Sequence, residues 1–209
     1  MALAYAKIAF TDAVRREQEE RGSAHIYEWM LDEDTGPENV LSAKEASFIE
    51  TMNGFYQATV NEHGWPYVQF RGGPVGFLKV LDKTRIGYAD LRGNRQYLSL
   101  GNLAGNDRIS IILMDYAQRR RLKLLGRVEI VSIQEDPELV KKLSIAKYKA
   151  IPERAVIINI EALDWNCSAH IPVRLSLEEL EPQLYKMREE LVGLRAENAE
   201  LKALVSQSL

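Results

Sequence analysis

The residues best suited to chemistry lie between Trp65 and Gly126, where arginines recur beside glycines. An Arg-Gly-Gly-Pro corner occupies 71–74, a Gly-Asn-Arg-Gln turn occupies 93–96, and three arginines occupy 119–121, with strand-like segments between them. Glycines allow the backbone to approach a flat ligand closely, and guanidinium groups bind phosphate through forked donors. The region therefore predicts an apolar strand platform edged by groups that can hold a phosphate.

The turn at 93–96 is the leading candidate for a phosphate site. Asn94 is of a type that caps helices, and the pattern predicts a short helix over 95–104. Free N–H groups and the positive dipole end at such a helix N-terminus attract anions, and Arg95 adds a charged donor. The alternative is a capped surface helix whose arginine is merely solvated.

The order and spacing of five short motifs resemble the pyridoxamine 5'-phosphate oxidase-like family of split-barrel flavoproteins. The motifs are Ala89-Asp90, Gly93-Asn94-Arg95, Asn102-Leu103, Asn106-Asp107-Arg108 and Leu124-Leu125-Gly126. The resemblance covers roughly residues 40–175. It implies a mainly β fold with flanking helices, built on a six-stranded antiparallel split β-barrel. It also implies a homodimer with FMN in each of two clefts between the subunits.

The resemblance assigns candidate cofactor contacts along the barrel. Backbone groups of Arg71-Gly72-Gly73-Pro74 would bond the edge of the flavin ring, and Tyr88-Ala89 would touch the cofactor from the next strand. Relatives place phosphate ligands at Asn94-Arg95-Gln96, often as Ser-Arg-Lys, so neutral Gln96 leaves one charge to be supplied elsewhere. A barrel bulge at the glycines is compatible with this role.

Further contacts are implied near the barrel ends. Relatives present a glutamine near Arg121 to the flavin from the partner subunit, and true oxidases carry a Trp and an Arg at a spacing comparable to Trp165 and Arg174. Here Trp165 would cover the ring, while His170 or Arg174 would face a substrate. The competing interpretations are a solvated hairpin at 119–121, a packed core tryptophan and a surface histidine. The three histidines are too scattered for a zinc site.

The stretch 137–144 lacks the Tyr, Arg and Ser set with which true oxidases hold the substrate phosphate, so the sequence argues against vitamin B6 oxidation. The leading hypothesis is an FMN-dependent oxidoreductase. It would take hydride or electrons from a nicotinamide cofactor or a small organic molecule at flavin N5, with no protein acid or base required. The rival hypothesis is a non-catalytic flavin-binding or sensing dimer whose C-terminal arm recruits partners. Other relatives bind deazaflavin or haem, but the phosphate cluster and the few histidines favour FMN.

Composition narrows the classes of partner. The 209-residue chain carries a formal net charge of −3, which argues against nucleic-acid binding. Its one cysteine, Cys167, excludes an intrachain disulfide and fits a reducing cytoplasmic setting. Lys7 and Asp12 interrupt the N-terminal apolar residues, so neither a signal peptide nor a membrane span is expected there.

The elements fall into three parts. Residues 1–54 read as helical and are expected to pack on the barrel, with Thr11 and Ser42 as helix caps and a second helix ending at Asn53-Gly54. Residues 55–175 form the barrel domain. Its predicted strands are 55–60, 67–70, 76–81, 85–90, 108–115, 120–134 and 155–163, with a helix opening at Asp136-Pro137.

Residues 176–209 predict a coiled coil. Counting Leu177 as position a, the a sites are Leu177, Leu184, Leu191, Asn198 and Val205, and the d sites are Leu180, Met187, Leu194, Leu201 and Ser208. A lone Asn at an a site and opposite charges at g and the following e favour two parallel strands. Pro182 suits a first turn, so the continuous coil is expected to start there. The alternative is an amphipathic helix lying on its own domain.

Overall fold

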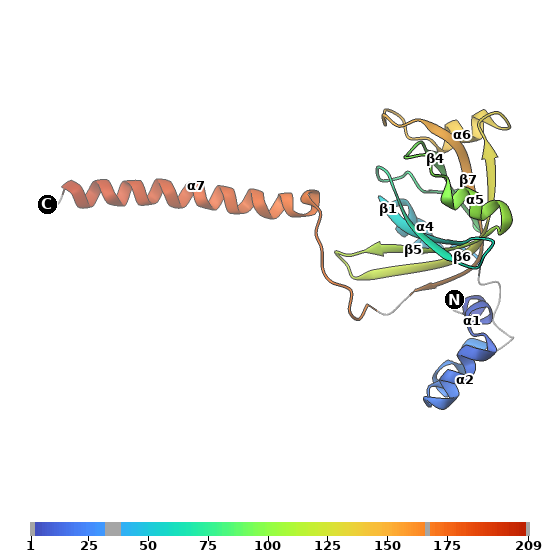
Figure 1. Cartoon of the computed structure of the whole chain (residues 1–209). Coiled ribbons are helices and arrows are strands. Elements are labelled where there is room, and N and C mark those ends of the chain that lie inside the picture. The colour runs from blue at the N-terminus through green and yellow to red at the C-terminus, as the bar shows by residue number, and fades with distance from the viewer. Residues whose placement is uncertain (1–2, 32–38, 166–167, 208–209) are drawn as a thin grey trace.

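The computed structural model describes residues 3–31, 39–165 and 168–207. Seven antiparallel strands form one sheet in the order β2-β1-β5-β6-β7-β4-β3 (Figure 1). Their bounds are β1 Gly54–Val60, β2 Pro66–Gly72, β3 Lys79–Val80, β4 Arg85–Leu91, β5 Arg108–Asp115, β6 Arg120–Ser132 and β7 Pro152–Trp165. The prediction of six strands was therefore wrong by one.

The strand expected over 76–81 is reduced to the two-residue β3. Its first half is a turn instead, because Phe77 N donates to Pro74 O and Gly76 adopts a positive φ of 84°. The β1–β2 hairpin, β5 and the long β6 follow the predicted segments closely. Alternating apolar residues and the Asn61–Gly64 turn determined those boundaries.

The sheet curls until its two ends face each other, but β2 and β3 are not neighbours in it. Side chains close the gap: Arg71 on β2 reaches Asp90 on β4, and Tyr88 on β4 reaches Gln57 on β1. Gly126 lies at the register shift between β6 and β7, where an added Cβ would stand 2.5 Å from Asn159 O. Only glycine permits that approach.

The core fills the inside of the curl. Phe55, Ile111, Leu113 and Leu124 are among its fully buried members. Helix α4 (Ala43–Glu50) packs against β3 and adds Phe48 and Ile49 to the core. Its predicted capping box, Ser42 with Glu45, is confirmed, although the helix ends before Asn53-Gly54.

Besides α4 and α5 (Leu98–Gly105), the described residues form five other short helices. They are α1 Leu3–Ala9, α2 Asp12–Glu20, α3 Ala24–Tyr27, the 3-10 helix η1 Glu28–Leu31, and α6 Pro137–Leu143. Thr11 caps α2 and Asp136 caps α6, as expected. Helix α1 packs on β7, and α6 packs against β4, β6 and β7.

The last element, α7 (Leu177–Gln207), extends away from the barrel (Figure 1). It starts with a capping box between Ser176 and Glu179 and runs unbroken through Pro182, so the expectation that continuous helix begins at Pro182 was wrong. The proline lies close enough to the start that it removes only one early hydrogen bond. Among the described residues, no helix is long and apolar enough to cross a membrane.

Candidate functional site

A cavity of about 220 Å³ opens between β2, β4 and the loop that follows β4. Gln69 and Arg71 supply one wall and Asp90 another, while Asn94, Arg95 and Gln96 form the rim. The floor is the start of helix α5 (Leu98–Gly105). Two strand ends and one helix N-terminus therefore converge on this space.

The loop at 93–97 is shaped by two left-handed residues. Arg95 has a φ of 61° and Tyr97 a φ of 52°, which are uncommon for residues other than glycine. Asn94 does not cap a helix: its Oδ1 accepts from Gln96 N at 3.1 Å within the loop. The helix predicted over 95–104 thus begins at Leu98, because the Asn94 amide stabilises a turn instead.

Because α5 starts at Leu98, its N-terminus lies at the cavity. The N-cap residue, Tyr97, makes no side-chain cap hydrogen bond to α5. The first residues of α5, Leu98, Ser99 and Leu100, line the cavity. A helix end without a side-chain cap has N–H groups available for an anion.

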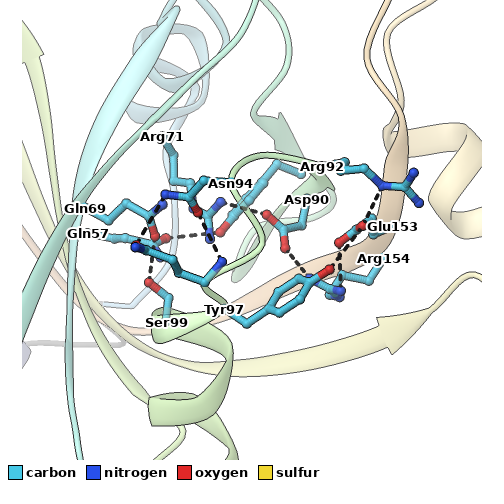
Figure 2. A network of polar contacts seen from close by, with 12 residues as sticks. Gln57, Gln69, Arg71, Asp90, Arg92, Asn94, Tyr97, Ser99, Glu153 and Arg154 are labelled. Atoms are coloured by element: carbon cyan, nitrogen blue, oxygen red, sulfur yellow. Dashed lines mark hydrogen bonds and ion pairs between the residues drawn. The ribbon is translucent and has the colours of Figure 1, made fainter.

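A chain of ion pairs runs beside the cavity, which Arg71, Asp90 and Glu153 of this chain line (Figure 2). Asp90 accepts from Arg71 Nη1 at 2.8 Å and from Arg154 Nη1 at 2.7 Å. Arg154 Nη2 in turn lies 3.0 Å from Glu153 Oε2, and Arg92 Nε lies 2.9 Å from Glu153 Oε1. The hydrogen bond from Arg92 helps to hold the pKa of Glu153 below its usual value.

The barrel interior beside the cavity is also polar. Tyr88 donates to Gln57, Ser99 donates to Gln69, and Asn102 donates to Thr59, so α5 is fastened to β1 and β2 by side chains. Burial raises the pKa of Tyr88, which keeps its hydroxyl protonated. The Nε2 of Gln57 and the Nε of Arg71 are buried without a hydrogen-bond partner among the described residues. Two donors are therefore left for an acceptor that the described part of the chain does not provide.

The charge of the site fits one phosphate group. Four arginines (Arg71, Arg92, Arg95 and Arg154) surround two carboxylates, Asp90 and Glu153, which leaves a formal surplus of two positive charges. A phosphate monoester carries about −1.5 to −2 at neutral pH. Arg95 is exposed and has no ion-pair or hydrogen-bond partner among the described residues, so it is free to bind that anion.

A second hollow of about 280 Å³ adjoins the first and shares Arg71 and Asp90 with it. Gly72, Tyr88 and Ala89 line it, so the structure brings these residues beside Arg71 and the 94–96 loop. Gly73 and Pro74 instead form the turn that follows β2, where Gly73 N bonds Asn53 O. The side chain of Tyr88 points into the core and stacks edge-on against Phe55.

The remaining candidates lie away from this cavity within one subunit. Trp165 packs edge-on against Phe48, and Arg174 lies over the Tyr116 ring at 4.9 Å. Arg121 stands beside the β5–β6 turn, with its Nε buried and unpaired among the described residues. His170 is exposed at a positive φ of 63°. None of these four residues lines either hollow.

Sequence analysis gave no role to Asp90, Glu153 and Arg154, which link the arginines of the site. A signal was present, since Asp90 interrupts the apolar strand 85–91 and a buried carboxylate requires a charged partner. The strand pairing that places Arg154 opposite Asp90 could not be read from the sequence.

Glu45 connects the tail residue Trp165 to α4. It accepts from Trp165 Nε1 at 2.6 Å and from Ser42 N at 3.1 Å. Burial alone would raise the pKa of Glu45, but the hydrogen bonds from Ser42 and Trp165 outweigh it and lower the pKa below its ordinary value. This carboxylate therefore stabilises the fold above its unfolded-state pKa, and the contribution is lost as the pH falls through the folded-state pKa.

We expect Glu45→Gln to lower the free energy of unfolding by about 1–3 kcal/mol at neutral pH, because the amide cannot accept from both partners as the carboxylate does. Urea unfolding of wild type and Glu45→Gln across the acidic pH range measures this difference in the free energy of unfolding. The difference between the two proteins should disappear as the pH falls below the usual glutamate pKa of about 4.3. A gap that stays constant with pH would contradict the assignment.

A family model described as pyridoxamine 5'-phosphate oxidase matches residues 41–166, more than half of the chain. No curated protein matches the chain. Several solved structures are similar in arrangement.

A candidate pyridoxamine 5'-phosphate oxidase from Lactobacillus delbrueckii is 22% identical with a TM-score of 0.47, over 63% of this chain and 97% of that chain. An FMN-binding protein from Syntrophomonas wolfei is 14% identical with a TM-score of 0.46, over 75% of this chain and 96% of that chain. HupZ from Group A Streptococcus is 16% identical with a TM-score of 0.49, over 65% of this chain and 99% of that chain. Because the family model matches residues 41–166, the chain belongs to the pyridoxamine 5'-phosphate oxidase-like family of FMN-binding proteins.

Proposed function

We propose that this protein binds FMN and works as a homodimeric oxidoreductase on a small molecule other than vitamin B6. The observation that carries the proposal is the free Arg95 beside the N-terminus of α5, inside a cluster with two surplus positive charges. Arg95 and the first N–H groups of α5 would hold the phosphate. The ring would lie along Arg71, Gly72 and Ala89, where the second hollow adjoins the first.

One subunit does not enclose such a ligand. Pockets for ligands of drug size span about 300–1,000 Å³, and the cavity at the phosphate end holds about 220 Å³. A second subunit would complete it.

The outer face of β1 and β2 offers the surface for that contact. Tyr56 and Phe70 pack together with ring centroids 5.3 Å apart, and both are exposed, as is Val68. In the dimer, Arg121 of the second copy is our candidate for the flavin ring edge, because its buried Nε has no hydrogen-bond partner in the part of the chain that the structure describes.

The roles of the protein groups would be binding and orientation. Bound FMN supplies hydride or electron transfer, and that step requires no protein acid or base. Tyr88 remains neutral because burial raises its pKa, and its hydroxyl donates to Gln57, so it would not act as a base. A guanidinium at the ring edge would stabilise negative charge that develops during reduction.

The alternative is a flavin-binding sensor that uses the same site without turnover. The exposed helix α7 favours it, because a long unpaired arm is typical of proteins that assemble with others. Both functions share the cofactor and differ in whether a donor reduces it.

The test is anaerobic reduction of the reconstituted protein. The protein is loaded with FMN, freed of excess cofactor, and mixed with NADH or NADPH while the flavin absorbance is followed. We expect the flavin band to bleach within turnover times of seconds. Bound flavin that bleaches with dithionite but with neither nicotinamide would support the sensor, and a protein that retains no FMN would refute both.

A further inference from the structure

Helix α7 carries a stripe of apolar side chains that its own barrel does not cover. No described residue of this helix is buried, and Leu191, Leu194 and Leu201 are 48%, 55% and 55% exposed. The stripe repeats with a spacing of three and four residues, as in the seam of a coiled coil. A monomer that left so many leucines in water would be unusual.

We infer that α7 pairs in parallel with α7 of a second copy, and that this polarity brings the two barrels together so that pairing strengthens flavin binding. The inference rests on the proposed function for the flavin part only. The occupant of the stripe is a second copy of this chain, because the charges flanking the stripe are complementary to themselves in one orientation.

In a parallel pair, each g residue meets the following e residue of the other helix. Glu190 would face Arg195 of the second copy, and Glu197 would face Lys202, so symmetry gives four attractive contacts. In an antiparallel pair, g meets g and e meets e. The glutamates would then face glutamates and the basic residues would face basic residues, which is unfavourable.

Asn198 adds a second reason for two strands. It is the lone polar residue among the a sites from 177 to 205, and its amide can satisfy its hydrogen bonds by pairing with the same residue of the second copy. A helix lying on an apolar protein surface would leave that amide unpaired.

The polarity decides where the barrels lie. Helix α7 has 31 residues, which corresponds to about 46 Å at 1.5 Å per residue. An antiparallel pair would hold the two barrels at opposite ends of that length. A parallel pair places both Leu177 residues at the same end, with helix axes about 8–10 Å apart.

The base of α7 leads directly to the apolar outer face of the barrel. Arg174 lies over the Tyr116 ring, Tyr116 lies close to Tyr56, and Tyr56 packs against Phe70. Two copies joined at Leu177 would therefore bring these outer faces toward each other. This is the face proposed to complete the flavin cavity.

The coil would raise the effective concentration of the second barrel. Tethering two modules by a short connection gives effective concentrations in the millimolar range. Flavin affinity should then be independent of protein concentration in the wild type. A chain whose coil is weakened should lose flavin on dilution, because its barrels separate.

The experiment uses the full chain with Glu190→Lys and Glu197→Lys, which turns the four attractive contacts into repulsive ones. The control is Glu189→Lys and Glu200→Lys, with the same charge change on the same helix but at the outer f and c sites. All four glutamates are exposed, so folding should not change.

We expect the seam variant to raise the dimer dissociation constant by about 30-fold, equivalent to about 2 kcal/mol, and its apparent FMN affinity to fall on dilution. The control should behave as wild type. Adding a chain with Arg195→Glu and Lys202→Glu should restore pairing. Equal behaviour of seam variant and control would overturn the inference.

Cysteine cross-linking tests the polarity, with Cys167 first replaced by Ser. Parallel helices predict disulfide dimers for Leu180→Cys alone and for Val205→Cys alone. Cross-linking only in a mixture of the two variants would show antiparallel helices and refute the inference. If no variant binds FMN but these disulfides form, the proposed cofactor is wrong while the parallel coil stands.

Discussion

Replacement of Asp90 by alanine should destabilise the barrel by about 3–5 kcal/mol, the usual cost of removing one partner from a buried ion pair. The Asp90 side chain is 9% exposed, and those of Arg71 and Arg154 are 21% and 15% exposed. Without Asp90, Arg71 would lose its carboxylate in a poorly hydrated site, and Arg154 would keep only Glu153. The loss should also loosen the side-chain closure between β2 and β4.

Chemical unfolding of wild type and Asp90→Ala measures this effect. Glu17→Ala is the control, since its ion pair with Arg21 is 61% and 77% exposed and should contribute no more than about 1 kcal/mol. A variant as stable as the control would mean that the arginines are hydrated in solution and that Asp90 does not join the strands.

Replacement of Arg95 should weaken FMN binding by about 10- to 100-fold, because a charge-assisted hydrogen bond contributes about 1.5–3 kcal/mol. Stability should barely change, since the side chain is exposed and unpaired among the described residues. Because Arg95 has a positive φ, Arg95→Asn is the better variant: asparagine tolerates that conformation, and the substitution removes the guanidinium group.

Riboflavin provides the matched ligand, since it lacks the phosphate. We expect Arg95→Asn to reduce FMN affinity and leave riboflavin affinity unchanged, as measured by quenching of flavin fluorescence. Arg108→Ala, on an exposed arginine outside the cavity, should change neither affinity. An equal loss for both flavins would show that Arg95 does not bind the phosphate.

The parts of the fold that were predicted from sequence are those set by local chemistry. The Asn61–Gly64 turn, the caps at Thr11, Ser42 and Asp136, and the β5 segment each depend on residues a few positions apart. Apolar alternation located β6 as well. Such signals are nearly independent of tertiary structure.

Errors arose where two local preferences competed. Asn94 suits both a helix cap and an Asx turn, and the turn prevailed because Arg95 and Tyr97 adopt left-handed conformations. At Pro182, the capping box at Ser176 started the helix one turn earlier than the proline alone suggested.

The motif order grouped some residues of the candidate site, and their role in binding a cofactor stays a prediction. Residues of the 94–96 loop and Arg71 share one cavity, as expected from the motif order. Arg154 was missed because its pairing with Asp90 joins residues far apart in the chain, through the register of β4 and β7. Only long-range strand pairing places it there.

The most direct measurement is a crystal structure of the protein grown with FMN. We expect a dimer with one FMN in each of two clefts, its phosphate within hydrogen-bond distance of Arg95 and the first N–H groups of α5, and its ring in contact with both subunits. FMN bound elsewhere, or a cavity filled by side chains of a single subunit with no flavin, would contradict the account.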